Sequence, residues 1–96
     1  MSNDEQELKI IQLDGNLFED INNVYELLHQ QLEATTQLVY NLDSLWTWIC
    51  EIEKSIKIIW TNFQYSYEYQ YCFAIKLLKL FFDAKTNFNW EIILIC

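Results

Sequence analysis

Three short isoleucine-rich segments, separated by stretches of helical periodicity, constrain the fold of this 96-residue chain most. They read LKIIQL at 8–13, SIKIIW at 55–60 and EIILIC at 91–96. Runs of β-branched residues of this length predict strands. The first run stops at Asp14-Gly15, a turn signal that uses the only glycine of the chain. The last run is almost continuously apolar, so we expect a strand covered on both faces.

The intervening segments predict helices. The first carries Asn23 and Glu26 as a candidate capping pair. Its apolar residues at helical spacing are Val24, Leu27, Leu28 and Leu32. A loop at 34–40 then leads to a second helix at 41–51, and a third helix is predicted at 71–87. The buried side of the third helix comprises Phe73, Ala74, Leu77, Phe81 and Ala84. Residues 61–71 alternate tyrosine with polar residues and fit a strand, a short helix or a loop equally.

Strands separated by helices imply parallel pairing through right-handed crossovers. We therefore predict one α/β domain over residues 1–96, in which a three-stranded parallel sheet packs against three to four helices after a polar lead-in at 1–7. The predicted core includes Leu42, Leu45, Ile49, Leu77, Phe81, Ile93 and Leu94.

The segment YNLDSLWTWICE at 40–51 combines two patterns on one helix. Leu42, Leu45, Trp46 and Ile49 form an apolar stripe at helical spacing. The opposite side carries Asp43, Thr47 and Glu51 in a row. Because Trp46 and Trp48 lie about 200° apart on a helical wheel, we expect Trp46 to be largely buried and Trp48 to be at least partly exposed. The alternative is that Trp48 packs under the loop at 34–40.

The charge of the chain is strongly negative and unevenly distributed. Fourteen acids face six lysines, for a net charge of -8. Eleven of those acids, and only one of the lysines, fall in residues 1–53. This distribution argues against binding to nucleic acid or to anionic lipid and favours a basic protein partner or none. Solubility of an aromatic-rich chain is the alternative explanation.

Cysteine usage and the amino-terminal segment suggest a cytoplasmic protein. Cys50, Cys72 and Cys96 are odd in number and widely spaced, which supports neither a disulfide framework nor a zinc site. The polar, acidic start MSNDEQELK does not resemble a signal peptide, and no apolar run approaches the length of a membrane span.

The sequence offers no catalytic constellation. One glycine excludes a glycine-rich phosphate loop of the usual kind, and His29 has no serine, cysteine or carboxylate at a catalytic spacing. The tyrosines between 65 and 71 lack the basic groove that accompanies base stacking. We therefore expect no enzyme, no cofactor or metal, and no nucleic-acid or membrane binding.

Several separate motifs resemble the barstar family of intracellular ribonuclease inhibitors. These are IQLDG at 11–15, NLDSLW at 41–46, WTNF at 60–63 and FFDAK at 81–85 followed by an apolar strand. The most specific is NLDSLW, which is very close to the family's Asn-Leu-Asp-Ala-Leu-Trp. The resemblance spans residues 8–96 and implies the same three-stranded fold, in which the second helix and the loop before it enter the active site of a small secreted ribonuclease.

The resemblance also implies a partner-binding surface. Asn41 and Asp43 match the family motif, and Asp83 and Asn87 stand where the last helix of the family carries interface glutamates. Thr47 stands in place of the family's most important aspartate, and Tyr40 directly precedes the motif without the family's glycine and paired tyrosines. To this surface we add Glu51 as a further phosphate mimic and Trp48 as an apolar anchor.

The expected function is that of a barstar-like immunity protein that blocks a basic secreted ribonuclease or nuclease toxin. The departures at Thr47 and before Asn41 leave an alternative open, in which a protein of the same fold binds a non-ribonuclease toxin or a cytosolic partner. An enzyme on a borrowed scaffold is the third hypothesis. We expect a monomer, with a homodimer through exposed aromatic residues as the alternative.

Overall fold

The computed structural model describes residues 8–96, which form an α/β fold with a three-stranded parallel sheet and three α-helices. The predicted polar lead-in at 1–7 lies outside the described residues. The elements follow in the order β1 (Leu8–Asp14), the 3₁₀ helix η1 (Gly15–Glu19), α1 (Ile21–Gln31), α2 (Leu42–Glu51), β2 (Ser55–Thr61), α3 (Phe63–Asn87) and β3 (Trp90–Leu94). The predicted fold class is confirmed.

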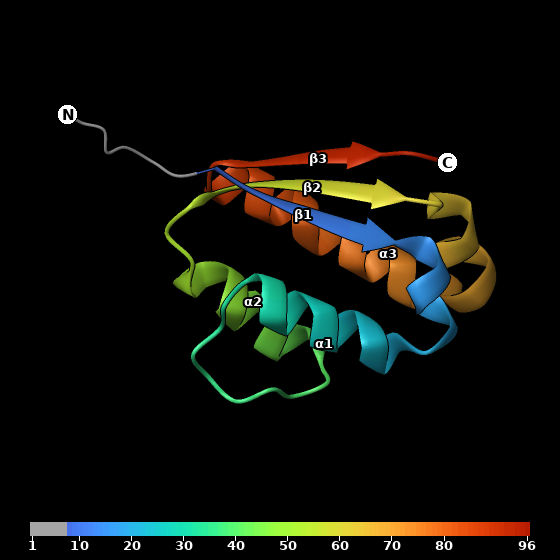
Figure 1. Ribbon diagram of the computed structural model, residues 1–96, viewed down its shortest axis with the longest axis horizontal. Helices are drawn as coiled ribbons and strands as arrows, with labels where there is room; N and C mark the ends of the chain where they lie inside the picture. The colour runs from blue at the N-terminus through green and yellow to red at the C-terminus, as the bar shows by residue number, and fades with distance from the viewer. Residues whose placement is uncertain (1–7) are drawn as a thin grey trace.

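The sheet has the order β1-β2-β3, so β2 is central and both other strands are edges. All the helices lie on one side of it, with α3 directly beneath the strands in Figure 1. Most inward-facing side chains on that side are buried, namely Ile11, Leu13, Ile56, Ile58, Trp60 and Trp90. Ile92 and Leu94 of β3 face the same side by their register with Ile58 and Trp60, but they are less covered. On the other side, Leu8 and Ile10 are exposed. The alternation of β1 follows directly from the period of two in a strand.

The prediction that the last strand is covered on both faces is wrong. β3 is an edge strand with helices on one side only, so its side chains are more exposed than a continuous apolar run suggests. Leu94, predicted to be core, is exposed, and Ile93 and Leu42 are half-buried. The other predicted core residues are buried.

The ambiguous segment before residue 71 belongs to α3. This helix begins at Phe63, after Asn62 in the left-handed region with φ 52°, and it has one non-helical residue, Gln70, at a kink. The alternating pattern of this segment did not distinguish a strand, a short helix and a loop. In the fold, the ring of Phe63 packs edge-on against Trp60, with 4.8 Å between the ring centroids, and this tertiary contact accompanies the helix. Beyond the kink, the predicted helix at 71–87 is present, with Ala74, Leu77, Phe81 and Ala84 buried.

The ends of β1 and β2 are joined by a polar junction that requires the glycine. Asp14 accepts hydrogen bonds from the backbone N–H of Asn16 at 2.9 Å and from the amide of Asn62 at 3.0 Å. Both interactions favour the carboxylate and lower the pKa of Asp14. A Cβ on Gly15 would overlap the backbone carbonyl of Asn62. Gly15 is therefore required for close approach of two backbones.

The first helix begins earlier than the sequence suggested. Asp20 is its N-cap and accepts a hydrogen bond from the backbone N–H of Asn22 at 3.0 Å. Asn23 and Glu26 lie inside the helix, so the predicted capping pair is wrong. Asp20 can cap a helix as effectively as Asn23, because aspartate and asparagine are equally good N-cap residues. With Asp20 as the cap, the helix starts at Ile21 and is about one turn longer than predicted. Within residues 8–96, no helix combines the length and apolarity that crossing a bilayer requires.

Candidate functional site

Asn41 fixes the start of α2, the helix that carries the predicted interface. Its backbone is extended, and its side-chain oxygen accepts a hydrogen bond of 2.7 Å from the backbone N–H of Ser44. This is the geometry of an N-cap, so the asparagine of the NLDSLW motif has a structural role of its own. Asp43 follows in the first turn, where a carboxylate also interacts favourably with the helix dipole.

Asp43, Thr47 and Glu51 form an exposed row along α2, as predicted. We call these three residues the acidic row. The hydroxyl of Thr47 donates to the backbone carbonyl of Asp43 at 3.2 Å. Among residues 8–96, neither the Asp43 carboxylate nor the Glu51 carboxylate forms an ion pair. The row therefore presents two negative charges to solvent with a hydroxyl between them.

The prediction that Trp48 is partly exposed is wrong. Its side chain is only 1% exposed and packs edge-on against the ring of His29, with 4.8 Å between the centroids. The buried side of α2 is formed by Leu45, Trp48 and Ile49. Trp46 is half-buried instead and lies 6.0 Å from the ring of Phe88, beyond the end of α3. Trp48 therefore cannot act as an apolar anchor for a partner in this conformation.

The loop between α1 and α2 covers Trp48 and is fixed at two points. The Tyr40 hydroxyl donates to the Glu26 carboxylate at 2.8 Å, which raises the pKa of Tyr40. The Nε2 atom of His29 lies 2.8 Å from the backbone carbonyl of Thr36, and because a carbonyl only accepts, Nε2 carries the hydrogen. The loop thus holds a defined shape beside the acidic row.

A hollow of about 230 Å³ lies between this loop and α2. It is lined by Thr36, Gln37, Val39, Ser44, Thr47 and Trp48. Thr47 belongs both to the hollow and to the acidic row, so the hollow lies beside the two exposed carboxylates. The hollow thus has an uncharged lining, with the two carboxylates of the acidic row beside it.

The two predicted residues on α3 lie apart from the acidic row. Asp83 is exposed and forms an ion pair with Lys79 at 3.8 Å, and Asn87 donates to the backbone carbonyl of Asp83 at 2.8 Å. The ring contact between Trp46 and Phe88 joins the middle of α2 to the end of α3. This contact is made by Phe88 and not by Asp83 or Asn87, and Lys79 already reduces the charge that Asp83 can offer.

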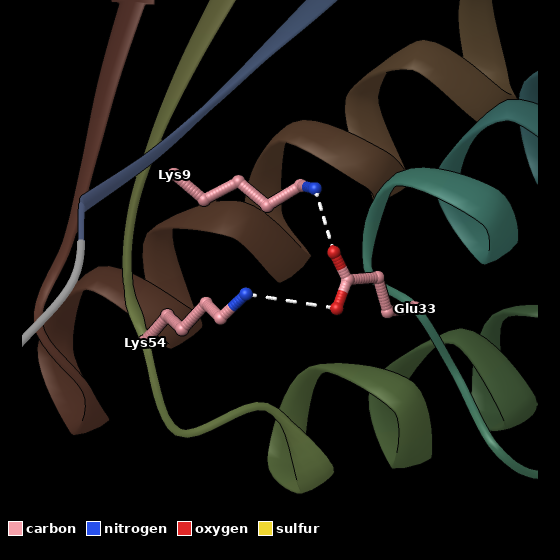
Figure 2. A network of polar contacts seen from close by, with 3 residues as sticks. All are labelled: Lys9, Glu33 and Lys54. Carbon is pink, nitrogen blue, oxygen red and sulfur yellow. Dashed lines mark hydrogen bonds and ion pairs between the residues drawn. The ribbon is translucent and has the colours of Figure 1, made fainter.

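Glu33 ties the same loop to the sheet (Figure 2). Its carboxylate accepts a hydrogen bond from Lys9 of β1 at 3.0 Å and forms an ion pair with Lys54, just before β2, at 3.6 Å. These two cations lower the pKa of Glu33. The residue has φ 54°, a left-handed conformation that is uncommon for glutamate, directly after α1 and its C-cap. Lys9, the only lysine of residues 1–53, thus pairs with Glu33 and does not neutralise the negative charge of the acidic row.

Sequence reasoning missed Glu26, Glu33 and Thr36 as organisers of the loop, because their contacts join residues between 7 and 24 positions apart. A tyrosine beside the motif was the one available signal. Three or more metal-ligating side chains do not come together anywhere in residues 8–96. No model of a known protein family matches the chain, and no curated protein matches it either.

Proposed function

We propose that the protein is a barstar-like immunity protein that binds and blocks the active site of a basic ribonuclease or nuclease toxin. The surface that binds is the acidic row of α2 together with the loop ending at Tyr40. Asn41 positions the start of the helix, and the family resemblance adds the exposed Asp83 and Asn87 of α3 to the surface. The proposal rests on the motif resemblance and on the uncompensated charge of the row.

The observation that carries the proposal is the bare pair of carboxylates on α2. Ribonuclease active sites hold RNA phosphates with cationic side chains, and a carboxylate can take a phosphate position there. Asp43 and Glu51 are exposed on one helix face, without ion-pair partners among the described residues. A rigid helix with a side-chain cap at Asn41 presents these groups at little entropic cost on binding.

Thr47 modifies the proposal, because a hydroxyl stands where the family has a carboxylate. Here the row is interrupted at its centre, and the hollow of about 230 Å³ opens at the same residue. A partner that projects a side chain into this hollow would use Thr47 as a neutral contact and Asp43 and Glu51 as its flanking charges. The partner then differs in detail from the family's usual target.

The same departure favours a second candidate function. A protein of this fold that binds a non-ribonuclease toxin or a cytosolic partner would also keep the helix cap and the shaped loop, and it would need no carboxylate at Thr47. Capture of a basic partner that has no ribonuclease activity would favour this second function over the first.

The test is inhibition of RNA cleavage by a small basic ribonuclease, titrated with the protein. We expect stoichiometric loss of cleavage, strong weakening of inhibition by Asp43→Ala, and less weakening by Asp83→Ala because Lys79 already pairs with that carboxylate. Glu91→Ala removes the same charge from β3, on the far side of the sheet, and serves as the matched control. If Asp43→Ala and Asp83→Ala both inhibit as well as the parent protein, the acidic row and Asp83 are only solvated surface and the proposal fails.

A further inference from the structure

Helix α3 presents a second apolar face in addition to the one that packs beneath the sheet. Tyr71, Ile75, Leu78 and Phe82 follow one another at spacings of four, three and four residues. At about 100° per residue they fall within about 60° of one another on the helix. Tyr71 is 60% exposed and Phe82 47% exposed, while Leu78 is half-buried. We call these four residues the α3 stripe.

The ring contacts of α3 fix the direction of the stripe. Phe73 packs against Phe18 and Tyr25, on the side of η1 and α1. Phe81 lies about 80° further around the helix and packs against Trp60 of β2 and Trp90 of β3. Phe82 lies a further 100° in the same sense. The stripe therefore points away from α1, toward the free edge of β3.

That edge of β3 has open backbone groups. The carbonyl of Asn89 accepts from the N–H of Ile56, and the N–H of Ile95 donates to the carbonyl of Trp60, so the odd-numbered residues turn toward β2. Because successive residues of a strand turn their backbone groups to opposite sides, Trp90, Ile92 and Leu94 turn theirs outward. No strand of residues 8–96 pairs with them there. The exposed side chain of Leu94 adds to the apolar area beside the stripe.

We infer that this surface binds a second copy of the chain in a dimer with two-fold symmetry. In the dimer, β3 pairs antiparallel with β3 of the second copy, and the two α3 helices pack antiparallel beneath the joined sheets. The stripe is symmetric about its midpoint between Lys76 and Leu77, so that Tyr71 meets Phe82 of the second copy. By the same symmetry Ile75 meets Leu78 of the second copy. A two-fold interface requires this kind of self-complementarity.

The charge distribution also favours a second copy at this surface. Residues 71–96 hold three lysines and two acids, whereas residues 1–53 hold eleven acids and one lysine. Two chains of net charge -8 repel each other least when they meet through the half that is not acidic. The acidic row lies on α2, and none of its residues belongs to the α3 stripe or to β3, so the proposed contact does not use it.

The size of the surface sets the expected strength of the dimer. The stripe rises about 17 Å from Tyr71 to Phe82, and β3 contributes only three outward-turned residues. Such a contact lies at the small end of specific interfaces, below about 1,200 Å² in total. The dimer therefore forms with rising concentration and dissociates on dilution.

Sedimentation equilibrium on the protein alone tests this inference. From about 10 μM to about 1 mM, the mass should rise from 11.7 kDa toward twice that value. Tyr71→Lys and Phe82→Glu should each weaken dimerisation about tenfold or more, because each places an unpaired charge in the contact. Mixing the two variants should restore the dimer, since the new ammonium group at position 71 then meets the new carboxylate at position 82.

The matched control is Ile10→Lys, which places a charge on the exposed outer face of the sheet. This variant should dimerise like the parent, and circular dichroism should show that all three variants are folded. The inference is overturned if the parent stays at 11.7 kDa throughout, if the mixture does not restore the dimer, or if Ile10→Lys abolishes the dimer instead. None of these measurements depends on the ribonuclease proposal, because no partner is present.

Discussion

Helices α2 and α3 both carry aromatic residues on two sides, yet they present opposite surfaces to solvent. On α2 the second tryptophan, Trp48, is buried, and the exposed side is acidic. On α3 the second apolar side, with Tyr71 and Phe82, stays exposed. The difference comes from what lies beside each helix. Trp48 of α2 packs against His29 of α1, next to a loop fixed through His29 and Tyr40, whereas α3 borders the last strand of the sheet. An apolar side chain in a helix is buried only where another element covers it.

The largest effect expected from this comparison is on stability. Trp48→Ala should lower the free energy of unfolding by about 3–5 kcal/mol, because it removes a fully buried ring between α2 and the loop. Trp46→Ala should cost clearly less, since that ring is half-buried, and Phe82→Ala should stay within about 0.5 kcal/mol. Urea unfolding of the three variants below the concentration of dimerisation gives the order. A larger loss for Trp46 than for Trp48 would contradict the orientation of α2.

A second effect concerns the centre of the acidic row. Thr47→Asp should tighten binding to a ribonuclease of the barstar family's usual kind, by about tenfold or more, because it adds a charged acceptor between Asp43 and Glu51. The same change should weaken binding to a partner whose surface fits the hydroxyl and the hollow beside it. Equilibrium binding to each partner distinguishes the two proposed functions.

Thr86→Asp is the control for that substitution. The hydroxyl of Thr86 donates to the carbonyl four residues earlier at 3.1 Å on an exposed helix, as Thr47 does at 3.2 Å. The two variants have the same net charge and lose equivalent hydrogen bonds. Equal binding by both would show that only total charge matters, which would contradict a specific role for the acidic row.

A smaller effect, on the pH dependence of stability, distinguishes the ion-paired Glu33 from the unpaired Asp43 and Glu51 of the acidic row. Lys9 and Lys54 lower the pKa of Glu33, so its contribution to stability is present above the ordinary glutamate pKa of about 4.3 and is lost as the pH falls below it. Glu33→Gln should therefore lower the melting temperature slightly at pH 7 but not at about pH 3. Raising the salt concentration should shrink the difference at pH 7.

Glu51→Gln is the control, because Glu51 has no ion-pair partner among the described residues. It should not lower the melting temperature at either pH value, since a carboxylate at the last residue of α2 gains nothing from the helix dipole. A loss of the same size at both pH values in Glu33→Gln would contradict a role for the charge of Glu33 in holding the loop.

The strands, the bounds of α2 and the loop before it could be predicted because their signals are local. β-branched runs gave all three strands, and Asn41 marked the start of α2 to within one residue. The side of α2 that is buried could not be predicted, since Trp48 is covered by a loop whose position depends on His29 and Tyr40. The exposure of Leu94 was missed for a similar reason. The order of the strands makes β3 an edge strand, and this order cannot be inferred from an apolar run in the sequence.

The site was predictable in part. The acidic row followed from helical spacing, because the three residues are four apart and share a face. The charge that the row presents depends on where the lysines lie. The ion pair of Lys79 with Asp83 could be predicted from their spacing of four residues on one helix, but the ion pair of Lys9 with Glu33 could not, because these residues are far apart in the sequence. The α3 stripe was not predicted from the sequence, because its exposure depends on the free edge of β3.

The most direct test of the central claim is the association rate with a small basic ribonuclease, measured for the parent, Asp43→Asn and Glu91→Gln. Both variants lose one charge, but Asp43 lies in the acidic row and Glu91 lies on β3. The salt concentration would be raised from about 0.01 M to about 0.1 M, over which the Debye length falls from about 30 Å to about 10 Å. We predict that salt slows association of the parent, and that Asp43→Asn lowers both the rate and its salt dependence much more than Glu91→Gln does. Equal rates for the two variants, or a parent rate that does not depend on salt, would contradict the account.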